Sequence, residues 1–193
     1  MARKIKERNI KSPSITIIGE GLTERCYFKH LKSIYNYRYI CKPRNFSQQT
    51  LSDIQKQIDK VLADDGIAVC VFDADVARDK PSEMKKLQDM RKKYAGRNDV
   101  VICDSMPSIE FWFLIHYLST NKHFATSEDV IKVLRKYIPD FSKHESFLSK
   151  EKWVSDMVND GKLDDALNRA KHFGTSGESY SNVYKAFKKF QEE

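Results

Sequence analysis

The sequence predicts an α/β protein with a four-stranded parallel sheet flanked by helices and a helical C-terminal extension. Short runs rich in β-branched residues alternate with amphipathic helical segments over the first 120 residues, which is typical of parallel strands joined by helices. The chain holds seven glycines and five prolines in 193 residues, so a hairpin-rich all-β fold is disfavoured. Beyond residue 120 the pattern is helical and predicts no further strand.

Each strand is predicted by a short apolar run that ends at a turn or at an acidic residue. Residues 14–18 read SITII and stop at a Gly-Glu-Gly turn, and residues 37–41 are a second candidate. Residues 66–73 are almost continuously apolar, as expected of a strand buried on both faces, and residues 99–104 form the fourth run. Because helices separate these runs, right-handed crossovers and a parallel sheet follow.

The helices are predicted by apolar side chains at helical spacing. They are expected from residue 23 onward, over 47–62, 81–94 and 108–118, and around 130–137, 153–158, 163–173 and 180–190. The chain should therefore consist of a basic arm over residues 1–11, an α/β core over 12–120, and a helical extension over 121–193 that packs on the core.

The composition is that of a globular protein with a basic tilt. The chain has 34 Lys and Arg against 27 Asp and Glu, a formal net charge of +7, and 40% hydrophobic residues, which excludes the disordered and fibrous classes. Residues 1–11 carry five basic residues and one Glu; such arms commonly contact nucleic acid, the alternative being a solvated tail. The sequence has neither a secretory signal nor a membrane-spanning run, and its four scattered cysteines indicate reduced thiols, so we expect a cytoplasmic protein without membrane contact.

Acidic residues follow the ends of the predicted strands, where parallel sheets bind ligands. Glu20 ends the first strand and Glu24 lies one helical turn later, whereas Asp73 and Asp75 end the third strand with a spacing that puts both carboxylates on one side. Glu110 follows the fourth strand in the first turn of a helix. Converging carboxylates repel one another unless a hard divalent cation neutralises them, and oxygen-only ligation suits Mg²⁺ or Mn²⁺.

The residues ITIIGEGLTERCYFKHL and the later VCVFDAD resemble the Toprim domain shared by topoisomerases, bacterial primases and OLD-type nucleases. Within that superfamily, the stretches SMPSIEFWFLIH and SYSNVYKAF are most similar to the RloB-like proteins of bacterial restriction and phage-defence loci. The resemblance runs from about residue 14 to about residue 190 and implies a Toprim-like core. The chain lacks room for the additional domains of a topoisomerase or primase, which favours a nuclease.

The resemblance implies a catalytic and metal-binding role for each of the five carboxylates. Glu20 would act in general acid–base catalysis or in metal binding. Asp73 and Asp75 would bind metal, and Glu24 and Glu110 would complete a two-metal site. Two ions can activate water on one side of a phosphodiester and stabilise the leaving oxygen on the other. The implied function is a Mg²⁺- or Mn²⁺-dependent endonuclease acting on DNA or RNA in anti-phage defence and abortive infection, with an ATPase as partner. A homodimer is compatible with the sequence, which does not determine the oligomeric state.

Further polar residues near the strand ends are candidate substrate contacts. Gly21 would let a phosphate approach the turn after the first strand. The basic candidates follow the third and second predicted strands. The neutral candidates lie after the fourth strand and before the last helix, and for them capping of the following helix is an equally weighted alternative. These candidates are Arg78, Lys80, Lys42, Arg44, Ser105, Tyr180, Ser181 and Asn182.

Two other functions stay open on the sequence. A non-catalytic nucleic-acid-binding or regulatory module could keep the acidic pocket as a structural metal site, and its binding would survive chelation. A phosphotransfer enzyme could use Asp73 as a nucleophile, which predicts a trapped aspartyl phosphate but gives Glu20 no role.

Overall fold

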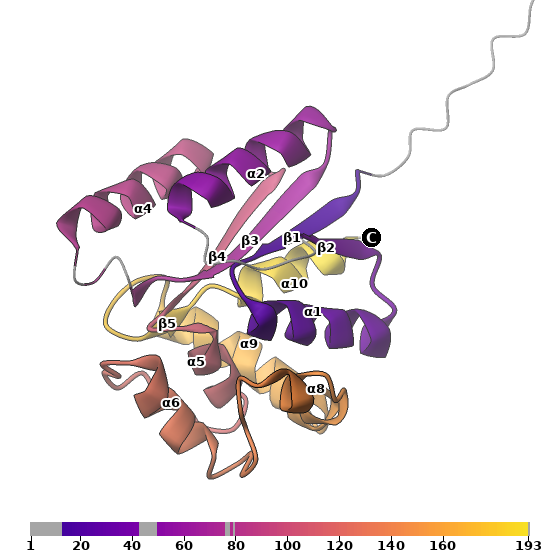
Figure 1. Ribbon diagram of the computed structural model, residues 1–193, viewed down its shortest axis with the longest axis vertical. Helices are drawn as coiled ribbons and strands as arrows, with labels where there is room; N and C mark the ends of the chain where they lie inside the picture. Colours follow the sequence, from indigo (N-terminus) through magenta and orange to yellow (C-terminus); the bar gives the residue numbers. More distant parts are fainter. Residues whose placement is uncertain (1–12, 43–49, 76–77, 79, 193) are drawn as a thin grey trace, which may run out of the picture.

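The computed structural model describes residues 13–42, 50–75, 78 and 80–192 and has the predicted α/β architecture (Figure 1). Within these residues, a five-stranded sheet has the order β2-β1-β3-β4-β5. The first four strands are parallel and β5 is antiparallel to β4, an arrangement consistent with a Toprim-like fold. The strands are β1 (Ile15–Gly19), β2 (Tyr39–Lys42), β3 (Ile67–Asp73), β4 (Val100–Met106) and β5 (Tyr180–Ser181).

Helices cover both faces of the sheet. On one face lie α2 (Leu51–Ala63) and α4 (Pro81–Tyr94), and on the other lie α1 (Leu22–Tyr35) and α10 (Tyr184–Phe190) (Figure 1). Alternate residues of β1 supply the two cores, because Ile18 packs with α2 whereas Ile17 packs on the opposite side. This alternation explains why the strand is apolar throughout.

The C-terminal part of the chain packs on the α1 face and shares its hydrophobic core. The ring of Phe187 lies 5.7 Å from that of Trp112, and the indole N–H of Trp112 donates to the Tyr27 hydroxyl at 2.7 Å. The predicted limits of the arm, core and extension stay predictions, and residues 1–11 lie outside the described part. The remaining helices are α5 (Ile109–Leu114), α6 (Ser127–Leu134), α7 (Glu145–Leu148), α8 (Lys152–Val158) and α9 (Lys162–Phe173).

The prediction of one helix over 180–190 and of no strand beyond residue 120 was wrong. Tyr180 and Ser181 form β5, which pairs with Met106 and Ser105 of β4, and α10 begins only at Tyr184. A two-residue strand has no detectable period, so only its tertiary pairing reveals it. The helix predicted over 108–118 is also shorter, since α5 ends at Leu114.

Two further findings bear on the composition. No helix in the described part of the chain is long and apolar enough to cross a membrane. All four cysteines are free thiols, as expected, and three of them are buried.

Candidate functional site

The parallel sheet brings four of the predicted carboxylates to its carboxyl edge. Glu20 follows β1 directly, Asp73 is the last residue of β3, and Glu24 and Glu110 lie in the first turns of α1 and α5. The register pairs Gly19 with Val71, so β1 and β3 end side by side. The site is therefore built from strand ends and from the helices that leave them.

Hydrogen bonds tie these chain segments together. The backbone N–H of Asp73 donates to Glu20 Oε2 at 3.1 Å, which links the ends of β1 and β3. The backbone N–H of Ile109 donates to Asp73 Oδ1 at 2.8 Å, which links β3 to the start of α5. Each carboxylate thus keeps one oxygen outside these two bonds.

Glu24 is almost fully buried, with 4% of its surface exposed. Its Oε2 has no hydrogen-bond partner among the described residues. A Cβ atom on Gly21 would lie 2.9 Å from this oxygen, closer than such contacts occur. The backbone of Gly21 is extended, so a side chain here would be opposed by the position of the Glu24 carboxylate rather than by backbone conformation. The Glu24 carboxylate lies where this Cβ would be, and contact of Gly21 with a phosphate stays a prediction.

Burial and mutual repulsion raise the pKa values of three of these acids. Desolvation raises the pKa of Glu24 to about 7, and the charges of Glu110 and Glu20 add to the effect. Desolvation also raises the pKa of Glu20, although the Asp73 N–H opposes the shift. The pKa of Asp73 is raised well above its ordinary value by desolvation and then by its acidic neighbours. Without a metal, burial and mutual repulsion therefore favour the protonated forms of these three acids.

Glu110 has a cationic partner that the sequence did not reveal. Its side chain is fully buried, Ser108 Oγ donates to its Oε2 at 2.6 Å, and Lys143 Nζ lies 3.1 Å from its Oε1. Burial lowers the pKa of Lys143, but the Glu110 carboxylate outweighs this and the net shift is upward. A fully buried glutamate on an apolar helix indicates that a cation must neutralise it. The sequence around residue 143 does not predict that Lys143 is this cation.

Asp75, the fifth predicted carboxylate, is partly exposed, and its charge contributes to the raised pKa of Glu20. The five acidic residues are thus electrostatically coupled at one edge of the sheet. No three Asp, Glu, His or Cys side chains among the described residues are arranged to hold a metal ion as they stand. Asp73 Oδ1 instead accepts from the Ile109 N–H, and Glu110 Oε1 forms an ion pair with Lys143.

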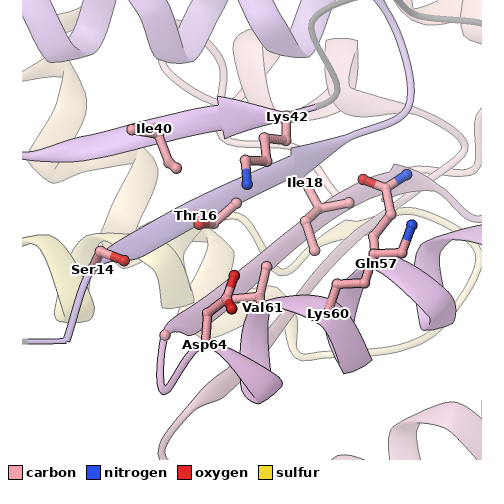
Figure 2. Close-up of a pocket in the computed structure, with 10 residues that line it drawn as sticks. Ser14, Thr16, Ile18, Ile40, Lys42, Gln57, Lys60, Val61 and Asp64 are labelled. Atoms are coloured by element: carbon pink, nitrogen blue, oxygen red, sulfur yellow. The ribbon is translucent and has the colours of Figure 1, made fainter.

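The basic candidates lie in three different places. The Arg78 guanidinium donates to the carbonyl oxygens of Phe124, Ala125 and Glu178 at 2.7–3.1 Å, so it fastens the segment after β3 to the C-terminal part. Lys80 is exposed at the start of α4. Lys42 lines a separate pocket of about 430 Å³ between the β1–β2 edge and α2, where its side chain lies over Thr16 (Figure 2). Arg44 lies outside the described residues.

The neutral candidates form a buried network at the β4–β5 pair. The hydroxyls of Ser105 and Ser181 are 2.8 Å apart. Tyr180 donates its hydroxyl to Asp104 Oδ2 at 2.7 Å, and Asn182 Nδ2 donates to Asp104 Oδ1 at 2.9 Å. These bonds give all four side chains a structural role, and contact with a substrate stays a prediction.

The comparisons with known proteins place the chain in a family. A family model described as RloB-like protein matches residues 15–189. No curated protein and no solved structure matches the chain. Since the match spans nearly the whole sequence, the chain belongs to the RloB-like protein family.

Proposed function

We propose that this protein is a Mg²⁺- or Mn²⁺-dependent nuclease that hydrolyses phosphodiester bonds of DNA or RNA at the carboxylate cluster. The observation that carries the proposal is the convergence of Glu20, Glu24, Asp73 and Glu110 at the carboxyl edge of the sheet, where repulsion and desolvation raise the pKa values of three of them. Such an arrangement is unfavourable in a merely structural site and is what a divalent cation would relieve.

The donor chemistry of the cluster fits a hard metal ion. Every acidic ligand offers oxygen, and Glu24 Oε2 is buried without a hydrogen-bond partner among the described residues. The residues that would hold the metal are Glu20, Glu24, Asp73, Asp75 and Glu110. Because no three of them are arranged for coordination in the absence of metal, binding requires their side chains to rotate. A bound ion would neutralise charge and lower the pKa of a coordinated water.

The chain's own residues would supply the remaining chemistry. Glu20 has a raised pKa and is therefore a better proton acceptor near neutral pH than an ordinary glutamate. Lys143 keeps its proton because its pKa is raised, so it acts as a fixed positive charge and not as a base. It faces the same cluster, where it can pair with the charge that develops on a phosphate in the transition state.

The family and the resemblance support a role in anti-phage defence, with an ATPase as partner. Nucleic acid is the substrate class that fits both the acidic site and the net charge of +7. A nucleic-acid-binding module without catalysis is the second candidate, because one oxygen of Asp73 and one of Glu110 already interact with Ile109 and Lys143 of the chain.

The test is cleavage by the full chain of single- and double-stranded DNA and RNA, with Mg²⁺, Mn²⁺ or EDTA. Asp73→Asn should lower the cleavage rate by about 100-fold or more. The matched control is Asp89→Asn, which makes the same change at an exposed site on α4 and should cleave normally. Because a partner can be required, phage plaque counts are measured with the same variants in cells. Nucleic acid left intact, together with unchanged protection by Asp73→Asn, would overturn the proposal.

A further inference from the structure

A second charged pocket lies at the outer edge of β4, between α4 and α10, and has a volume of about 410 Å³. We call it the β4-edge pocket, and its charged lining is Arg91, Arg97, Asp104, Lys185 and Lys188. The β5 strand pairs only with Ser105 and Met106, so the earlier part of this edge has no strand beside it within the described residues.

Two of the four cations in the β4-edge pocket have no carboxylate partner in the described part of the chain. Arg91 forms an ion pair with Asp104, and Arg97 donates two hydrogen bonds to Asp99 at 2.6 and 2.7 Å. Lys185 and Lys188 form no ion pair with any described carboxylate. They are three residues apart on α10 and so lie on the same side of that helix. The pocket therefore carries two uncompensated positive charges.

Lys185 is only partly exposed, and desolvation lowers its pKa despite the nearby Asp104. A desolvated ammonium group without a counter-ion gains stability when an anion binds. Lys188 is exposed and adds charge at the rim. This local imbalance is independent of the carboxylate cluster.

The inner wall of the pocket is held rigidly. Arg91 Nη2 donates to Asp104 and to the Tyr180 hydroxyl at 2.7 Å, and the guanidinium lies 5.6 Å from the centre of the Tyr180 ring. Asp104 is 1% exposed and also accepts a bond from Asn182, which in turn donates to the carbonyl of Thr175. Arg91 makes no other side-chain hydrogen bond to the described residues, so the remaining N–H groups of its guanidinium can donate to a ligand.

We propose that the β4-edge pocket binds a phosphate of the nucleic-acid backbone at a position separate from the scissile bond. An oriented guanidinium beside two ammonium groups is a phosphate-binding set. Asp104 is directly followed in β4 by Ser105, which pairs in register with Asp73, so the inner wall of the pocket and the acidic cluster lie on neighbouring strands. The inference rests on the proposed function for the identity of the ligand, and it names a contact that the acidic cluster cannot supply.

The test measures oligonucleotide binding to the full chain in EDTA over a range of salt concentrations. Lys185→Gln/Lys188→Gln is compared with Lys185→Arg/Lys188→Arg, which keeps both charges. The charge-matched control is Lys136→Gln/Lys150→Gln, at two exposed lysines of the C-terminal part without ion pairs among the described residues. Thermal melting of each variant verifies folding, and ATP titrated by calorimetry is the small phosphate probe.

Lys185→Gln/Lys188→Gln should weaken oligonucleotide binding by about tenfold or more and reduce the slope of log K against log salt by about 2. The arginine pair and the control should bind like the wild type. Unchanged affinity and slope in the glutamine pair would overturn the proposal, and so would loss of ATP binding without loss of oligonucleotide binding, since the pocket would then serve a free nucleotide. Because hydrolysis is not measured, failure of the nuclease proposal and failure of this one give different results.

Discussion

Lys143 Nζ lies 3.1 Å from Glu110 Oε1, and this contact joins the segment between α6 and α7 to a fully buried glutamate at the sheet edge. The pair couples the C-terminal part of the chain to the candidate site. It also gives the acidic cluster a basic neighbour that the sequence did not reveal. Removing either partner alone leaves the other without its counter-charge.

The first prediction concerns this pair. Lys143→Gln should lower the free energy of unfolding at pH 8 by about 1–2 kcal/mol, between the values for exposed and buried ion pairs, because the lysine side chain is 43% exposed. Urea denaturation in EDTA measures it, with Lys150→Gln as the control. In a Glu110→Gln background, Lys143→Gln should lower the free energy of unfolding much less. Equal costs in both backgrounds would show that the two residues do not interact.

The second prediction concerns pH and Glu24. Its pKa in the folded protein is about 7 against an ordinary value of 4.5, so the folded state binds the proton more tightly than the unfolded state. This contribution to stability is present at low pH and is lost as pH rises from about 4.5 through about 7. Glu24→Gln should therefore stabilise the metal-free protein at pH 8, by on the order of 3 kcal/mol at most, and by little at pH 5.

Urea denaturation at the two pH values measures this difference. Glu151→Gln, at the exposed glutamate just before α8, is the control, and its effect on the free energy of unfolding should be the same at both pH values. A Glu24→Gln protein that is less stable than the wild type at pH 8 would contradict the raised pKa.

The third prediction concerns proton release on metal binding. Because the pKa values of Glu20, Glu24 and Asp73 are raised, Mn²⁺ must displace protons, and its affinity should increase with pH. Calorimetric titration at pH 6.5 in buffers of different ionisation enthalpy counts the protons released. Glu24→Gln should release fewer. A binding enthalpy that is the same in every buffer would mean that the carboxylates are already ionised.

The fourth prediction concerns the space above Gly21. Gly21→Ala places a Cβ against Glu24 Oε2 and should displace this carboxylate, weakening Mn²⁺ binding by about tenfold. In a Glu24→Ala background the obstacle is absent, so Gly21→Ala should then leave stability unchanged or slightly increase it. Thermal melting and Mn²⁺ titration of the four proteins form a complete cycle. Equal effects of Gly21→Ala in both backgrounds would rule out the contact.

The parallel strands could be predicted because their signal is local. β1 and β3 are apolar runs next to turn residues, and Asp73 and Glu20 lie at their ends, so both the fold class and the position of the acids followed from the sequence. β5 could not be predicted, because Tyr180 and Ser181 become a strand only by pairing with β4. The helix predicted over 180–190 follows from the apolar spacing of α10, but that prediction begins four residues before the helix does.

The chemistry of the site was less predictable than its position. Lys143 reaches Glu110 only through tertiary packing, and it changes the formal charge of the five-carboxylate site from −5 to −4. The raised pKa values of Glu24 and Asp73 reduce the negative charge further in the metal-free state. Both effects depend on burial and neighbours, which the spacing of acidic residues in the sequence does not report.

The nuclease proposal depends on metal binding by these carboxylates. Crystals of the protein grown with Mn²⁺ and measured by anomalous diffraction test it directly. We expect manganese density coordinated by Glu24 and Asp73, with Glu20, Asp75 or Glu110 as further ligands and with Lys143 moved away from Glu110. Crystals at saturating Mn²⁺ without density at this edge, and with the Lys143–Glu110 pair intact, would contradict the proposed metal site.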